Sequence, residues 1–167
     1  KGNDYFAQKK FLCAINSYDV VVASYKSNAY GKAMGQYNRA IAYAALQIDS
    51  YAISLQAGRD YNRAVASGQL PANLASIANY NAGVMFWEIA ESRVKVNTTK
   101  LAFYELAISK VEIGLNTSSA EDKPTRTFAL FPVRCSYAKL LMQQITAQKS
   151  KKRTEDVTKL TEKLNAA

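Results

Sequence analysis

The chain has 167 residues, of which 49% are hydrophobic and 21% charged, and 22 Lys and Arg against 13 Asp and Glu give it a formal net charge of +9. This composition suits one folded domain over residues 1–167 and excludes an intrinsically disordered chain. No apolar run approaches the roughly 20 residues needed to span a membrane. With only 3 Pro and 7 Gly, few breakers interrupt helices, so we expect an all-α protein.

Two similar segments in the first third of the chain each predict a helical hairpin. Residues 37–43 (YNRAIAY) are followed, after a predicted turn at residues 48–50, by a second apolar-faced segment at residues 51–55. Residues 2–18 show the same order of a small residue, an aromatic residue, a break near residues 8–10, and a second helix with aromatic residues and Ala-Ile. The repetition favours a stack of hairpins over a bundle.

A third hairpin has a long first helix that starts just after Pro71 and contains residues 80–86, and a second helix that contains residues 103–109. Residues 95–100 are expected to connect these two helices. The hairpin is longer than the first two.

A weaker fourth hairpin is expected after a polar break at residues 116–127. Its first helix would cover residues 131–148, with Pro132 in the first turn, where the missing N–H costs nothing. Residues 149–153 would connect it to a helix at residues 154–165. The four predicted hairpins span residues 1–28, 32–67, 72–115 and 128–165.

Small and aromatic residues recur at matching places in these hairpins. The first helices carry the pairs Gly2 with Tyr5, Ala40 with Tyr43 and Gly83 with Phe86, and the second helices carry Ala14, Ala52 and Ala107. In these positions the chain resembles the tetratricopeptide repeat (TPR) family. The resemblance implies a right-handed superhelix of three to four antiparallel helical hairpins, a TPR-like α-solenoid.

The small residues have a physical role, because they let two helix backbones approach to roughly 8–10 Å. Ala52 is expected at the closest contact within its hairpin. The three alanines are 38 and 55 positions apart, whereas the family repeat is roughly 34 residues. The helices are therefore expected to be lengthened.

The resemblance implies a concave groove in which Asn3, Asn38 and Asn81 contact the backbone of an extended peptide. A side-chain amide suits this task because it offers two donors and an acceptor. Tyr37 and Tyr80 precede groove asparagines and could line the same partner site. The alternatives are that the asparagines cap or cross-link helices and that the tyrosines pack in the core.

A carboxylate clamp for a peptide C-terminus, known in one branch of the family, is not expected. Only Asn3 and Asn38 match two of its five positions, and Ile77 and Asn81 stand where the clamp requires Lys and Arg.

Neither an enzyme nor a metal or cofactor site is expected, because the chain contains no His and no glycine-rich phosphate-binding motif. Cys13 and Cys135 lack metal-ligand spacing and are interpreted as two buried thiols. Glu88 and Glu91 lie on one face of a predicted helix and are interpreted as part of a solvated face.

The net charge favours an acidic partner. The basic run at residues 149–153 could meet an anion, but Glu155 and Asp156 follow it, so we interpret it as a solvated turn and nucleic acid as a weak candidate partner. The chain begins at Lys1 without Met, which indicates processing or trimming upstream. The compartment stays open: cytoplasmic or, if an upstream signal is removed, periplasmic or otherwise extracytoplasmic.

The leading functional hypothesis is a scaffold or adaptor that binds a peptide segment or a partner helix in the concave groove. Two alternatives stay open. One is a structural protein that self-associates into a homo-oligomer. The other is an accessory protein that binds a small ligand in the cavity of the stack.

Overall fold

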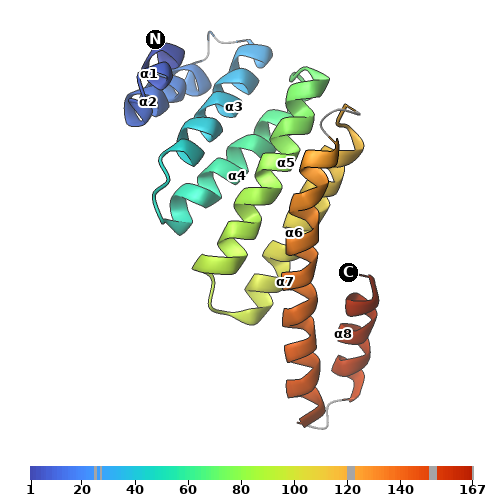
Figure 1. Cartoon of the computed structure of the whole chain (residues 1–167). Helices are drawn as coiled ribbons and strands as arrows, with labels where there is room; N and C mark the ends of the chain where they lie inside the picture. Colours follow the sequence, from blue (N-terminus) through green and yellow to red (C-terminus); the bar gives the residue numbers. More distant parts are fainter. Residues whose placement is uncertain (25, 27, 120–122, 151–153, 167) are drawn as a thin grey trace.

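The regular secondary structure is all helical over the residues that the computed structural model describes, which are 1–24, 26, 28–119, 123–150 and 154–166. These ranges contain no strand, so the predicted all-α class is confirmed (Figure 1). The helices are α1 (Gly2–Ala7), α2 (Phe11–Ala23), α3 (Ala29–Ala45), α4 (Tyr51–Ala66), α5 (Ala72–Glu88), the π-helical turn η1 (Ile89–Arg93), α6 (Asn97–Asn116), α7 (Lys123–Ser150) and α8 (Thr154–Ala166).

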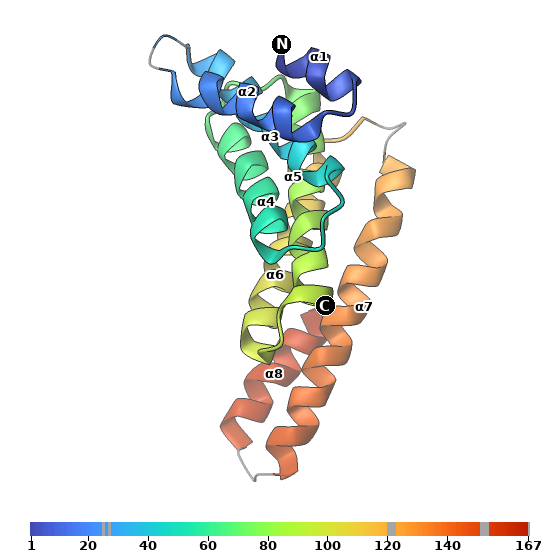
Figure 2. The ribbon, with the colours of Figure 1, turned by 90° about the vertical axis from the view of Figure 1, so that its left-hand side faces the viewer.

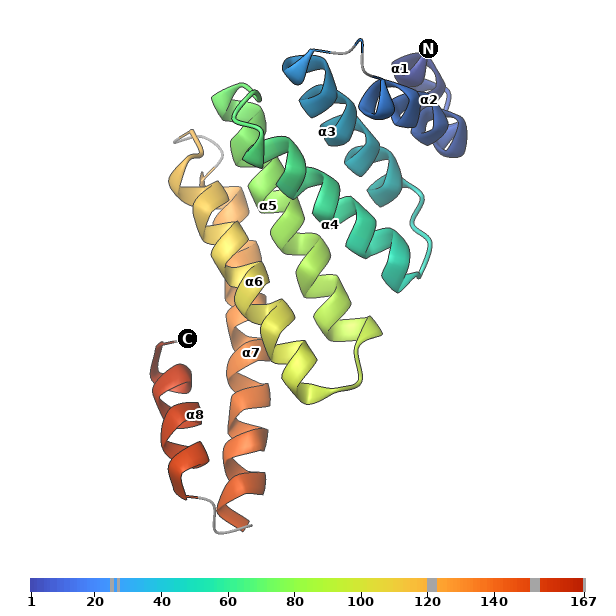
Figure 3. The same ribbon diagram turned by 180° about the vertical axis from the view of Figure 1, so that it is seen from behind.

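Successive helices lie side by side, and extensive packing occurs between neighbours along the chain. The α7–α8 pair lies at the opposite end of the molecule from α1 and α2 (Figures 1 and 2). In Figure 1, α5 and α7 lie in front of α4 and α6, and the view from behind reverses this order (Figure 3). The helices α5 and α7, each the first helix of a hairpin, therefore lie in one layer, and the second helices α4 and α6 lie in another. None of the helices among the described residues is both long and apolar enough to cross a membrane.

Glycines set a close helix contact between α5 and α6. A Cβ atom on Gly83 would lie 2.9 Å from the main-chain oxygen of Ala107, and one on Gly114 would lie 2.8 Å from the main-chain nitrogen of Tyr80. Main-chain atoms inside a helix cannot move aside, so only glycine fits at either position. The expectation that the small residue Gly83 lets two backbones approach is confirmed.

The closest contact of α4 lies later in the helix than expected. Ala52 is exposed, whereas Ala57 and Gly58 are buried. A Cβ atom on Gly58 would lie 2.7 Å from the ring of Phe86 in α5. The expectation for Ala52 is therefore wrong, because α4 crosses its neighbours more than one turn after its first residue. In the second helices α2, α4 and α6 a buried Ala precedes a larger buried side chain by four residues: Ala14 and Tyr18, Ala57 and Tyr61, and Ala107 and Val111.

The helix α7 begins earlier than predicted. It starts at Lys123 and places Pro132 inside the helix, which corrects the expectation that Pro132 lies in the first turn. Pro124 occupies the first turn instead, where the missing N–H costs nothing. The polar break is correspondingly shorter than residues 116–127. The interpretation of the basic run at 149–153 as a solvated turn lies outside the described residues.

A buried ionic network joins α2, α3 and α4. The Arg39 guanidinium donates from Nε and Nη2 to the two carboxylate oxygens of Asp60, each at 2.7 Å, and from Nη1 to Asp19 at 2.6 Å. Gln56 also donates to Asp60, at 3.0 Å. Asp60 is 0% exposed. The hydrogen bonds to Asp60 raise the pKa of Arg39 above its ordinary value, against the opposing effect of burial.

Candidate functional site

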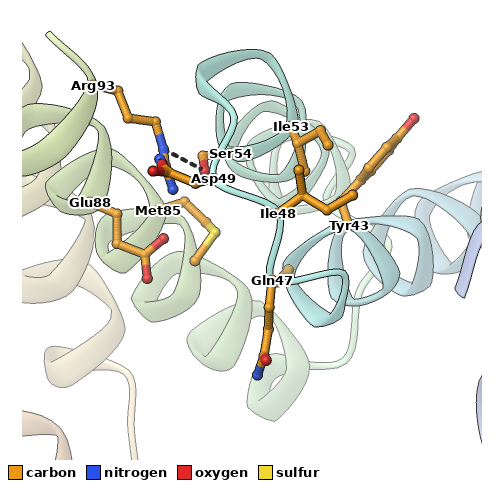
Figure 4. Close-up of a pocket in the computed structure, with 10 residues that line it drawn as sticks. Tyr43, Gln47, Ile48, Asp49, Ile53, Ser54, Met85, Glu88 and Arg93 are labelled. Carbon is orange, nitrogen blue, oxygen red and sulfur yellow. Dashed lines mark hydrogen bonds and ion pairs between the residues drawn. The ribbon is translucent and has the colours of Figure 1, made fainter. Parts of the chain in front are cut away.

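A cavity of about 340 Å³ lies where the end of α3 and the start of α4 meet the end of α5 and η1 (Figure 4). Its apolar lining comes from Tyr43, Ile48, Ile53 and Met85. Its polar lining includes Ser54, Asp49, Glu88 and Arg93. A cavity that combines apolar walls with a few converging polar groups is the usual form of a binding site.

The connection between α3 and α4 forms one side of this cavity. Gln47 has a φ of 51°, in the left-handed region that a residue with a side chain rarely adopts. The chain turns there, and Ser50 N–H donates to the carbonyl of Ile48 at 2.8 Å. This turn presents Ile48 and Asp49 to the cavity.

The π-helical turn η1 forms the opposite side. Such turns add a residue to the helical repeat and occur often at functional sites. Here Ile89 and Ala90 are fully buried, while the charged residues around them point to different partners. Glu88 and Arg93 line the cavity, but Glu91 contacts α6.

Glu91 accepts several hydrogen bonds outside the cavity. Its Oε1 accepts from Trp87 Nε1 at 3.1 Å and from the Tyr104 hydroxyl at 2.9 Å. Burial raises the pKa of Glu91, but hydrogen bonds from Ser136, Tyr104 and Trp87 outweigh burial, so the net pKa is lowered. Glu91 is exposed, as its interpretation as part of a solvated face predicts, and its carboxylate also contacts α6.

Arg93 is held at one side of the cavity by two partners. Its guanidinium forms an ion pair with Asp49, and its Nε donates to the hydroxyl of Ser54 at 3.3 Å. Ser54 is buried and the Arg93 side chain nearly so, whereas Asp49 is largely exposed. The contact connects η1 to both the α3–α4 connection and α4.

Glu88 has no such partner. Its side chain is half-buried, and none of the described residues forms a hydrogen bond or an ion pair with its carboxylate. Burial raises its pKa above the ordinary value of a glutamate. Glu88 is therefore an unpaired carboxylate in a cavity, which corrects its interpretation as part of a solvated face.

The predicted groove residues Asn3 and Asn38 meet in a second cavity, of about 230 Å³, between α1, α2 and α3. Phe6, Tyr18 and Ile41 also line it. Asn3 Oδ1 accepts a hydrogen bond from the Tyr18 hydroxyl at 2.7 Å. The Asn38 amide has no hydrogen-bond partner within the described part of the chain, so it remains available.

The other predicted groove residues lie elsewhere. Asn81 Nδ2 makes a long hydrogen bond of 3.5 Å to the hydroxyl of Tyr61, which connects α5 to α4. Tyr37 is 7% exposed and packs edge-on against Tyr61, so its ring belongs to the core. Tyr80 is half-buried, and its backbone lies against Gly114 of α6. Of the five predicted residues, the structure brings together Asn3 and Asn38.

The two cysteines are both exposed free thiols. Cys13 lies on the outward face of α2 and Cys135 on that of α7, so the interpretation of both as buried thiols is wrong. Among the described residues there is also no group of three or more His, Cys, Asp and Glu side chains that could hold a metal ion.

Sequence reasoning did not find Ser54, Asp49 or Arg93 as site residues. Arg93 lies in η1, and Asp49 is placed by the turn at Gln47. Neither backbone irregularity has a distinctive sequence pattern. The only available signal was the group of charged residues Glu88, Glu91 and Arg93 that follows the apolar α5.

The fold places this chain in the class of all-helical proteins built from helices that pack with their neighbours along the chain. No family model, curated protein or solved structure matches the chain.

Proposed function

We propose that this chain is a protein-binding scaffold or adaptor, a right-handed TPR-like superhelix of helical hairpins. An extended segment of a partner protein runs across the first helices α1, α3 and α5. One observation carries the proposal: two cavities are lined by residues from consecutive first helices, and each contains a polar group that has no partner among the described residues, Asn38 or Glu88.

The cavities suit side chains and peptide groups of a bound segment. First helices pack mainly on second helices and hardly on each other, so hollows remain between α1 and α3 and between α3 and α5. In the first hollow, the Asn38 amide can donate to a peptide carbonyl and accept from a peptide N–H. Because these hydrogen bonds involve only the backbone of the bound segment, segments with many different side chains can bind.

The net positive charge of the chain adds a preference for acidic partners. The net charge of +9 attracts a segment that is acidic overall and accelerates its association at low salt. This field acts over the whole surface, whereas the cavities select individual groups.

A phage-displayed library of random peptides tests the proposal. We expect the full chain to enrich a related set of peptides and Asn38→Ala to bind them at least tenfold more weakly without a loss of thermal stability. Asn81→Ala is the matched control: its amide contacts Tyr61 inside the stack, so it lowers stability and leaves affinity unchanged. Absence of enrichment, or unchanged affinity in Asn38→Ala, would refute the proposal.

A second candidate function is self-association through α7. Phe131 and Met142 are 73% and 58% exposed, and Cys135 and Ala138 lie between them on the same face. Their spacing of four, three and four residues is that of a coiled-coil seam. Light scattering across a range of concentrations tests this idea: we expect a dimer that Met142→Lys dissociates, and a concentration-independent monomer would exclude it.

A further inference from the structure

The charges in the cavity between α3, α4 and η1 do not balance. Two carboxylates, Asp49 and Glu88, line it together with one cation, Arg93. Arg93 forms its ion pair with Asp49, so the charge of Glu88 is left over. This local excess of negative charge is notable in a chain of net charge +9.

Arg93 is not placed to neutralise Glu88. Its guanidinium points toward Asp49 and Ser54, and the Glu88 carboxylate points away from it (Figure 4). Moving Arg93 to Glu88 would leave the buried Ser54 hydroxyl and Asp49 without their partner. None of the other described residues that line the cavity carries a positive charge, so a counter-charge for Glu88 would come from a bound group.

We infer that this cavity receives the side chain of a lysine or arginine from the bound segment, with Glu88 as its counter-charge. The inference rests on the proposed function and names the residue class that the second cavity selects. A segment that is acidic overall but contains one lysine or arginine fits both features: its acidic residues are attracted by the net positive charge of the molecule, and its basic side chain pairs with Glu88.

The walls of the cavity fit the shape of such a side chain. Lysine and arginine have an apolar stem and a charged end, and they bury the stem against apolar surface. Ile48, Ile53 and Met85 provide this apolar surface. The volume of about 340 Å³ is at the small end of ligand sites, which suits one side chain.

The state of Glu88 supports the inference. A half-buried carboxylate without a partner lowers the stability of the free protein, and its raised pKa reports that cost. A cation within about 4–6 Å would lower the pKa again and remove the cost. The protein thus keeps a residue that is unfavourable when free and favourable when a basic side chain is bound.

An NMR titration of the full ¹⁵N-labelled chain tests the inference with defined probes. The probes are the Nα-acetyl methylamides of lysine, arginine and norleucine, and spermidine as a free polyamine. We expect the lysine and arginine probes to shift amides in residues 43–54 and 85–93 and the norleucine probe, which has the stem without the charge, to leave them unchanged. Glu88→Gln should weaken lysine binding at least tenfold.

The control variant is Glu91→Gln, because Glu91 lies outside the cavity and a glutamine oxygen can still accept from Tyr104 and Trp87. It should bind the lysine probe as the parent chain does. Equal shifts with norleucine, or undiminished lysine binding in Glu88→Gln, would overturn the inference. Binding of spermidine without binding of the lysine probe would also overturn it, in favour of a free polyamine.

The two proposals fail in different ways. If no peptide is enriched by the phage library, the protein-binding function fails. If peptides are enriched without any preference for lysine or arginine and the lysine probe causes no shifts, only the inference about Glu88 fails. An unchanged or higher thermal midpoint of Glu88→Gln shows that lost binding is not a loss of fold.

Discussion

Replacing Asp60 by Asn removes the charge that stabilises Arg39 inside the stack. The Arg39 side chain is 11% exposed and the Asp60 side chain 0% exposed, and two hydrogen bonds of 2.7 Å join them. In Asp60→Asn the remaining carboxylate near Arg39 is Asp19, whose side chain is 47% exposed. The guanidinium then lies in a low-dielectric contact with one partially solvated counter-ion.

The expected cost is about 3–5 kcal/mol, the usual loss when one partner of a buried ion pair is removed. A folded domain has a total stability of about 5–15 kcal/mol, so the variant should unfold at a much lower urea concentration. Asp19→Asn is the matched control at the exposed end of the same network, and it should cost about 1 kcal/mol or less.

Urea unfolding followed by circular dichroism measures both variants. A double-mutant cycle with Arg39→Met isolates the pair: because both charges are then gone, Arg39→Met/Asp60→Asn should be less destabilised than the sum of the single variants. A cost below about 1 kcal/mol for Asp60→Asn, or additive single effects, would refute the assignment of a strong buried pair.

Three further outcomes are expected. Gly83→Ala should lower the free energy of unfolding by about 1–3 kcal/mol, because its Cβ meets main-chain atoms of α6. Ala52→Leu, at an exposed position, should change it by no more than about 0.5 kcal/mol. Equal costs of the two variants in urea unfolding would show that the helix crossing is misplaced. Folding raises the pKa of Glu88, so its charge destabilises the fold at neutral pH; Glu88→Gln should raise the thermal midpoint at pH 7, and the gain should vanish below the unfolded-state pKa of about 4.3. A gain that is the same at both pH values would contradict this reasoning. Both exposed thiols, Cys13 and Cys135, should react with a thiol reagent in native buffer, and reaction only after denaturation would place them in the core.

Most helices of the first two thirds of the chain were predictable because their apolar residues recur with helical period and their breaks are local. The predicted connection at residues 95–100 is wrong, because α6 already begins at Asn97. Pro71 correctly marked the start of α5, and the predicted break near residues 8–10 coincides with Lys9 at a φ of 58°. The start of α7 was not predictable from Pro132, because a proline within a long helix and one in a first turn give the same local pattern.

The candidate site was predictable only in part. Asn3 and Asn38 are brought together because they lie on consecutive first helices, as the repeat pattern implies. Asn81 and Tyr37 instead contact Tyr61, since the displaced crossing of α4 puts that phenol between them. The Glu88 cavity depends on two backbone irregularities, Gln47 in a left-handed conformation and the π-helical turn η1. Neither has a sequence signature that periodicity can detect.

Packing between helices that are neighbours along the chain has a consequence for how the molecule folds. Contacts of short sequence separation require little loop closure, so folding should be fast and can start at any hairpin. The tight glycine contact of α5 and α6 is the natural nucleus, whereas α1 buries none of its residues and should exchange its amide hydrogens early. The half of the Asn38 cavity that α1 provides should therefore open readily, and a partner that enters there can order this end of the described chain as it binds.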